Sequence, residues 1–384
     1  MIAIKNAKVV LENGILFDGV VLVEEDKIIA VGDAMEIEIP ADAQIVDAAG
    51  AYVGPGFVDL HNHGGNGRFF YADPETAARH FLNQGTTTVL ATLYYDLSKQ
   101  DFIDSIRRVR NAMENGVAGK AIGGLYMEGP YMNPKYGASP EKNKWRGPIA
   151  REDYQDIIDE AGDLAKVWAI APEREGIEEF IKDAKKVNPS AMISVGHSEA
   201  TPAQVAKLKK YGLNLQTHCT NATGRVNERG GIRSAGPDEA CMTDKDMYAE
   251  IICDSCAIHV HKDTLQMIQS IKGIDRMVLI TDSYVSDGKS PEHLQHIEDL
   301  VFDDKSRLTG SKLTMNIACR NVMRHSNIGI CQAFLMASRN PARVIGMDNE
   351  VGSIEAGKRA NLVFVDDMFH VEKVMLNGQF VNRD

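Results

Sequence analysis

The chain has 384 residues, of which 44% are hydrophobic and 25% are charged, so it is long enough to bury a large core in one big domain or two. Its net charge of -12 disfavours nucleic acid, anionic membranes and, at long range, phosphorylated ligands, so a bound phosphate would need a local basic pocket. The first residues lack a secretory signal pattern, no apolar run reaches membrane-spanning length, and the six cysteines fit reduced thiols. These features predict a cytoplasmic protein with neither a nucleic-acid nor a membrane partner.

The two ends of the chain share a β-type pattern. Short runs at 2–10, 15–23, 27–31 and 44–47 alternate with turn residues, which predicts a small antiparallel sheet. The pattern returns near the C-terminus, where Asn377-Gly378 is a hairpin signal. We therefore predict one small discontinuous β-sandwich domain, formed by residues 1–53 and 346–384, with residues 54–345 inserted between its halves.

The inserted region alternates predicted strands with predicted helices. We expect strands at 56–61, 86–94, 122–128, 166–172, 191–197, 213–218, 249–256 and 276–282. Helices are expected at 74–83, 99–114, 151–163, 176–186, 201–210 and 262–271, several of them opened by Ser, Thr, Asp or Pro. Eight strands with crossover helices predict an α/β fold of the (β/α)8 TIM-barrel type for residues 54–345.

The first predicted barrel strand leads into a His-x-His pair. His61 and His63 are two positions apart, so on an extended chain their imidazoles lie on the same side and can share a cation. The pair alone is weak evidence, because short motifs of this kind often have no ligand. Its weight depends on other candidate ligands at the ends of later strands.

Such candidates do follow, since catalytic residues of barrel enzymes lie at the carboxyl ends of the strands. The predicted strand ends carry His61 and His63, Glu128, His197, His218 and Asp282. Each residue on its own also fits an ordinary role in packing, capping or a turn. Together they fit one or two divalent cations per chain, with zinc favoured and iron or manganese as alternatives, and Glu128 as the bridging carboxylate.

The chain resembles the amidohydrolase superfamily, and within it the N-acetylglucosamine-6-phosphate deacetylases. The resemblance spans nearly the full length and is carried by these segments: Gly54-Pro55-Gly56-Phe57-Val58-Asp59-Leu60-His61-Asn62-His63, Met127-Glu128-Gly129-Pro130-Tyr131, Gly196-His197-Ser198, Thr217-His218-Cys219-Thr220-Asn221-Ala222, Ile258-His259-Val260-His261, Thr281-Asp282 and Gly310-Ser311-Lys312-Leu313-Thr314-Met315. It implies a metal-dependent hydrolase that removes the acetyl group from an N-acetylated amino-sugar 6-phosphate with metal-activated water.

The resemblance also implies roles for individual residues. Metal ligands fall on Glu128, His197 and His218, with His61 and His63 completing a second site. Asp282 corresponds to the catalytic aspartate, which takes a proton from water and passes it to the leaving amine and also lies among the metal-type residues. The implied contacts with the sugar phosphate are made by Asn221, Ala222, His259 and Arg229, the last of these offered by a neighbouring subunit of a homodimer or higher homo-oligomer.

Some segments depart from the family pattern. Gly137-Ala138-Ser139 stands where a histidine contact is common, and the loop around Arg229 also differs, so Arg225 and Arg233 are alternatives for holding phosphate. The alternatives left open are N-acetylgalactosamine-6-phosphate or another N-acyl substrate, and a scaffold protein without activity. The retained ligand set argues against the scaffold, whereas the configuration of the sugar and the need for phosphate stay open.

Overall fold

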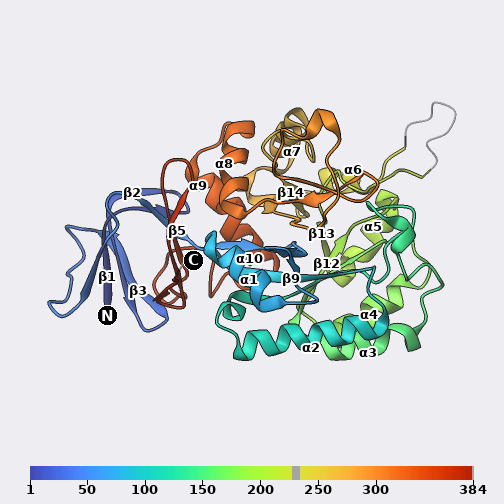
Figure 1. Cartoon of the computed structure of the whole chain (residues 1–384), viewed down its shortest axis with the longest axis horizontal. Coiled ribbons are helices and arrows are strands. Elements are labelled where there is room, and N and C mark those ends of the chain that lie inside the picture. Colours follow the sequence, from blue (N-terminus) through green and yellow to red (C-terminus); the bar gives the residue numbers. More distant parts are fainter. Residues whose placement is uncertain (227–233, 383–384) are drawn as a thin grey trace.

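The two termini form one sheet beside a barrel (Figure 1). A computed structural model of the chain describes residues 1–226 and 234–382. The terminal sheet contains, in spatial order, β20 (Gln379–Phe380), β19 (Val371–Leu376), β18 (Leu362–Val365), β5 (Tyr52–Pro55), β1 (Ile2–Leu11), β2 (Gly14–Glu24) and β3 (Lys27–Asp33), with β4 (Gln44–Asp47) also paired to β1. The link between the two termini is the antiparallel pairing of β18 with β5.

Alternating apolar residues explain why the terminal strands assemble. Ile4, Val21 and Val53 from the N-terminal strands share one buried cluster with Phe364 and Met375 from the C-terminal strands. The apolar face of a sheet must be buried away from water. Here the strands from both ends of the chain contribute side chains to the same buried cluster. The predicted joining of the two termini is therefore confirmed, in the form of a single hydrogen-bonded sheet.

The central region forms eight parallel strands in chain order, as predicted. They are β6 (Phe57–Asp59), β9 (Thr86–Tyr94), β10 (Ile122–Glu128), β11 (Ala165–Ile170), β12 (Met192–Val195), β13 (Leu213–Gln216), β14 (Tyr248–Ile252) and β15 (Met277–Ile280). The helices are α1 (Pro74–Asn83), α2 (Lys99–Asn115), α3 (Arg151–Ala161), α4 (Ile177–Val187), α5 (Pro202–Leu208), α6 (Pro237–Thr243), α7 (Lys262–Lys272), α8 (Met315–Ser326), α9 (Ile330–Phe334) and α10 (Asn340–Val344). Two hairpins, β7 (Gly64–Gly65) with β8 (Arg68–Phe69) and β16 (Leu300–Phe302) with β17 (Leu308–Ser311), extend from the strand ends.

Several helices begin where the sequence supplies a side-chain cap. The Asp73 carboxylate accepts a hydrogen bond from the Thr76 backbone at the start of α1. At α2 and α5, the caps Ser98 and Thr201 form reciprocal capping boxes. These caps fix where the crossover helices start, and thereby the lengths of the loops that carry the site.

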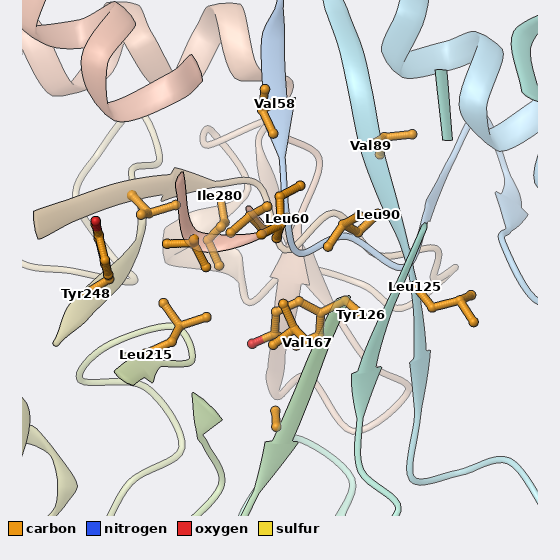
Figure 2. Packing of buried hydrophobic residues seen from close by; sticks show 14 of the residues in the cluster. Val58, Leu60, Val89, Leu90, Leu125, Tyr126, Val167, Leu215, Tyr248 and Ile280 are labelled. Carbon is orange, nitrogen blue, oxygen red and sulfur yellow. The ribbon is translucent and has the colours of Figure 1, made fainter. Parts of the chain in front are cut away.

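The barrel interior is filled by side chains from successive strands (Figure 2). Leu60, Leu90, Tyr126, Leu215 and Ile280 are fully buried there. A filled interior leaves no pore through the barrel, so a ligand must bind at one end of it.

The seam between the first and last strands is closed by hydrogen bonds outside the regular ladder. The Thr281 hydroxyl donates to Asp59 over 2.6 Å, and the Asp282 backbone N–H donates to the His61 carbonyl over 2.8 Å. Burial raises the pKa of Asp59 to about 7, although bonds from Thr281 and His61 oppose the shift. The seam thus ties together two segments that bear candidate ligands.

Six of the eight barrel strands end earlier than the sequence predicts: β6, β11, β12, β13, β14 and β15. β12, β13 and β15 stop at Val195, Gln216 and Ile280, whereas we expected them to continue through His197, His218 and Asp282. These last three residues adopt positive φ angles of 44°, 27° and 46°. A left-handed residue cannot continue a β ladder, and such strained backbone tends to occur at functional sites.

Candidate metal centre and active site

All six residues predicted as metal ligands meet at the carboxyl end of the barrel. Glu128 is the last residue of β10, and the other five lie in the segments that directly follow strands, with His61 and His63 after β6, His197 after β12, His218 after β13 and Asp282 after β15. The five imidazole and carboxylate residues Glu128, His61, His63, His197 and His218 are each at most 6% exposed. Buried polar groups need partners, and these six supply most of them to one another.

The first cluster consists of Glu128, His197 and His218, whose ligand atoms lie within 4.8 Å of one another. Glu128 Oε1 is 2.7 Å from His197 Nε2 and 3.4 Å from His218 Nε2. The two Nε2 atoms are 3.1 Å apart. Two nitrogens bound to one zinc at about 2.0–2.1 Å in tetrahedral geometry would be roughly 3.3 Å apart, so the spacing fits a shared cation.

The second cluster is formed by His61, His63 and Glu128. His63 Nε2 lies 3.4 Å from Glu128 Oε2 and 3.3 Å from Asp282 Oδ1, and His61 Nε2 lies 3.8 Å and 3.7 Å from the same two carboxyl groups. Glu128 Oε1 faces His197, His218 and His61, and Oε2 faces His63, so this carboxylate lies between the two clusters and could bridge them.

Hydrogen bonds at Nδ1 orient the imidazoles of His61 and His218 so that Nε2 can bind a cation. His61 Nδ1 lies 3.3 Å from Glu250, and His218 Nδ1 lies 3.2 Å from the Asn221 carbonyl oxygen. Each oxygen accepts a hydrogen bond from Nδ1–H, which leaves the lone pair of each Nε2 directed inward. Among the described residues, His61 Nε2 has no hydrogen-bond partner although it is buried. A buried lone pair beside converging carboxylates fits a divalent cation.

The electrostatics of the cluster also favour added positive charge. Burial opposes ionisation of Glu128 and Asp282, but the surrounding histidines lower the pKa of both carboxyl groups overall. Burial likewise opposes protonation of His61, yet Glu128 and Glu250 raise its pKa well above its usual value. The carboxylates therefore stay ionised and stabilise a cation at the rings.

Five of the six residues, all except His61, line a cavity of about 470 Å³. The predicted substrate residues Asn221, Ala222 and His259 lie on its wall, as do Lys135 and Arg307. Asn221 and Ala222 directly follow the His218 segment, so one flank of the cavity adjoins that ligand.

A second carboxylate orients His259. Asp254 Oδ2 lies 3.1 Å from His259 Nδ1 and accepts the backbone N–H of His259 over 2.8 Å. Burial tends to raise the pKa of Asp254, but these bonds lower it to about 2. His259 Nε2 is buried without a partner in the described part of the chain and is free to contact a ligand.

The expected phosphate residue Arg229 lies outside the described residues, as does its alternative Arg233. The other alternative, Arg225, forms an ion pair with Glu239. The two cations on the cavity wall are paired as well, Lys135 with Glu199 and Arg307 with Glu141. Ser139, which stands where a histidine is common, lies on the wall and donates to Asp303.

The sequence did not reveal several residues of the site. Glu250 lies within the apolar strand β14 and Asp254 lies just after it. The only signal in the sequence was an acidic residue inside or next to an apolar run. Tyr94, Asp96 and Tyr284 also line the cavity; Tyr94 ends β9, the other two follow β9 and β15, and none belongs to a recognisable motif. In the described ranges, no helix is long and apolar enough to cross a membrane.

Comparisons with known proteins agree with this geometry. The model of the amidohydrolase family matches residues 52–381. The chain is 30% identical to an N-acetylgalactosamine-6-phosphate deacetylase of Escherichia coli O157:H7, over 89% of this chain and 91% of the relative. It is 30% identical to an N-acetylglucosamine-6-phosphate deacetylase of Vibrio furnissii, over 95% and 91% of the two chains.

Solved structures give the same result. The crystal structure of N-acetylglucosamine-6-phosphate deacetylase from Pasteurella multocida superposes with a TM-score of 0.86 at 25% identity, over 99% of both chains. A mutant of the Mycobacterium smegmatis deacetylase, in complex with N-acetyl-D-glucosamine-6-phosphate, superposes with a TM-score of 0.81 at 26% identity, over 99% of this chain and 98% of that one. With the ligand set, the barrel and these matches in agreement, this chain belongs to the amidohydrolase family.

Proposed function

We propose that the protein removes the acetyl group from N-acetylglucosamine 6-phosphate. The observation that carries the proposal is Asp282, whose ionised carboxylate lies 3.3 Å from His63 at the edge of two clusters that share Glu128. This arrangement suits hydrolysis of an amide, because it combines Lewis-acid sites with a proton acceptor. The E. coli relative acts, by its name, on the galactosamine epimer, which is therefore the alternative substrate.

The residues that would hold the cations are Glu128, His197 and His218 for one, and His61, His63 and Glu128 for the other, with Asp282 alongside. We propose zinc, with iron or manganese as alternatives, because imidazole and carboxylate ligands suit these metals. When bound, such a cation polarises the amide carbonyl and lowers the pKa of water.

Asp282 moves the proton. Its carboxylate accepts a proton from the attacking water at Oδ1 and returns it to the nitrogen of the leaving amine, which departs as the amino sugar. The lowered pKa keeps Asp282 ionised before the reaction, so that its carboxylate is available as the acceptor.

Asn221, Ala222 and His259 would hold the sugar phosphate on the flank next to His218. The described cations on this wall are already paired with carboxylates, so an additional arginine is needed for the phosphate. We propose Arg229 for that role, offered by the partner in a homodimer or higher homo-oligomer. The named substrates of the relatives support the phosphate.

A substrate screen tests the function. Both epimers of N-acetylated hexosamine, each with and without 6-phosphate, are incubated with protein loaded with Zn²⁺, Mn²⁺ or Fe²⁺, and free amine is measured. We expect the highest kcat/KM for N-acetylglucosamine 6-phosphate. A preference for the galactosamine epimer would replace the substrate, and no activity on any of the four would refute the proposal.

Three further assignments are proposed on the same basis. The ligand chemistry and the relatives support an enzyme of the cytoplasm, where sugar phosphates are retained.

The sharing of strands supports one domain made of residues 1–53 and 346–384, and a catalytic domain of residues 54–345.

A further inference from the structure

A second cavity of about 660 Å³ adjoins the active-site cavity. It lies between the segment after β8 and the loops around the β16–β17 hairpin. The residues that line both cavities are Tyr94, Asp96, Ser139, Tyr284 and Thr309. One ligand could therefore extend from the metal-type residues of the first cavity into the second cavity.

Two tyrosines mark the boundary between the cavities. The hydroxyl groups of Tyr94 and Tyr284 are 3.2 Å apart, and both rings pack edge-on against His63, with centroids 4.9 Å and 5.3 Å away. The pair stands on the His63 flank, whereas Asn221 lies on the His218 flank. The site thus has a second flank to which no part of the substrate has been assigned.

Aromatic rings form one wall of the second cavity. Phe69 and Tyr71 stack with centroids 4.9 Å apart, and Phe69 also meets Tyr284 edge-on at 5.1 Å. These three side chains are only partly buried. Partly exposed rings at a cavity wall offer apolar faces to the C–H surface of a sugar ring.

The rest of the lining is polar and rich in carboxylates. It includes Asp96, Asp287, Asp303 and Asp304 against Lys142 and Lys289. Asp96 Oδ1 is buried and has no hydrogen-bond partner among the residues that the structure describes. Carboxylates accept hydrogen bonds from hydroxyl groups and repel phosphate, so this lining favours a neutral, hydroxyl-rich group over an anion or an aliphatic chain.

The chemistry of a hexosamine limits what can reach this cavity. In a pyranose the nitrogen is on C2, whereas the 6-phosphate extends from C5 on the opposite side of the ring. If the phosphate lies on the flank of Asn221 and His259, the groups nearest the second flank are the acyl group and the substituents on C1 and C3. A larger substituent at one of these positions would enter the second cavity.

We propose that this cavity is a subsite for a neutral sugar unit linked to the amino sugar, so that the enzyme also deacetylates a phosphorylated disaccharide. The inference rests on the proposed function, because it takes the amide to lie at the metal-type ligands. The sugar ring would stack on Tyr71 and donate hydroxyl hydrogen bonds to Asp96.

The test compares three substrates: N-acetylglucosamine 6-phosphate, its β-methyl glycoside, and the disaccharide in which glucose replaces the methyl group. The variants are Tyr71→Ala and the control Tyr71→Phe, which keeps the ring. Tyr71 lies outside the lining of the first cavity, and the melting temperature of each variant monitors folding. Binding of the disaccharide to metal-loaded protein is measured by calorimetry in parallel.

We expect the native protein to act on the disaccharide with a kcat/KM at least about tenfold above that for the methyl glycoside. Tyr71→Ala should abolish this advantage and leave the methyl glycoside unchanged, and Tyr71→Phe should retain it. A disaccharide that is neither bound nor hydrolysed, or equal losses on both glycosides, would overturn the subsite while the proposed function stands. Faster turnover of a longer N-acyl analogue that depends on Tyr71 would also overturn it. If the monosaccharide is not hydrolysed, the proposed function fails, and Tyr71-dependent calorimetric binding still decides the subsite.

Discussion

Two buried carboxylates, Glu250 and Asp254, determine which ring nitrogens of His61 and His259 face the cavity. Each accepts a hydrogen bond from Nδ1–H of its histidine, and each also accepts one from a backbone N–H, Glu250 from His218 and Asp254 from His259. Glu250 thus ties the His61 ring to the backbone of His218, whereas Asp254 holds both the ring and the backbone of His259. Such second contacts commonly tune metal affinity and ligand geometry.

Replacing Glu250 tests this role at the metal clusters. In Glu250→Gln the amide can present a donor to His61 Nδ1, so the lone pair of Nε2 is no longer held inward. We expect metal affinity to fall roughly 10–100-fold while the fold is retained. Titration of the stripped protein with Zn²⁺ measures it, with the exposed Glu114→Gln on α2 as the matched control. Unchanged affinity in Glu250→Gln would contradict the assignment.

Replacing Asp254 tests the substrate flank. Asp254→Asn removes the carboxylate that holds His259, so KM for the sugar phosphate should rise about tenfold or more, whereas kcat should change much less. Steady-state kinetics separate the two parameters. A loss confined to kcat would place His259 in the chemical step instead of in binding.

Single residues differ in how well the sequence predicts them. His61, His197 and Asp282 could be predicted because each belongs to a short recognisable sequence motif at the end of a predicted strand. Glu250 could not, because an isolated Glu in an apolar strand carries no sign of the histidine that reaches it from 189 positions away. Arg229 was predicted, and its placement is still a prediction.

At the scale of elements, the glycines before β6 allow close packing. A Cβ on Gly54 would lie 2.2 Å from the Phe334 ring of α9, and one on Gly56 would lie 2.1 Å from Thr87 Oγ1. These two contacts bring the terminal sheet and the first barrel strand against their neighbours. The segment that leads to His61 is therefore positioned by close packing on both sides.

Gly54→Ala should consequently destabilise the protein. The added methyl group forces Phe334 or β5 to move, which we expect to cost about 1–3 kcal/mol of unfolding free energy. Gly14→Ala is the control, because nothing lies within 4 Å of its Cβ position. Urea denaturation measures both, and equal stabilities would show that the contact relaxes without cost.

The sequence predicted the order and type of the barrel strands, because apolar runs of strand length alternate with helical segments, several of which begin at a capping residue. It did not predict where β12, β13 and β15 end. Their last predicted residues adopt positive φ angles, and that conformation is imposed by contacts at the site that local propensity does not contain. The closing seam between Asp59 and Thr281 is likewise a long-range contact, which joins residues 222 positions apart.

At the scale of the whole molecule, the acidic chain must hold an acidic substrate. The cations on the described cavity wall are paired with carboxylates, which is why we propose Arg229 as the phosphate ligand. Arg229→Ala should lower kcat/KM for the phosphorylated sugar by roughly one to two decades and leave the slow reaction of the unphosphorylated sugar unchanged. Equal losses on both substrates would indicate a role in ordering the loop, and full activity of a strictly monomeric protein would contradict a shared site.

Metal-dependent deacetylation is tested most directly by measuring acetate release from N-acetylglucosamine 6-phosphate as Zn²⁺ is added back to metal-stripped protein. Activity should be absent at first, rise with metal, and saturate near two equivalents per chain. Asp282→Asn should bind a similar amount of metal but release acetate at least about three orders of magnitude more slowly, because an amide cannot accept the proton. Full activity in the stripped protein, or a metal-loaded Asp282→Asn variant as active as the native protein, would contradict the account.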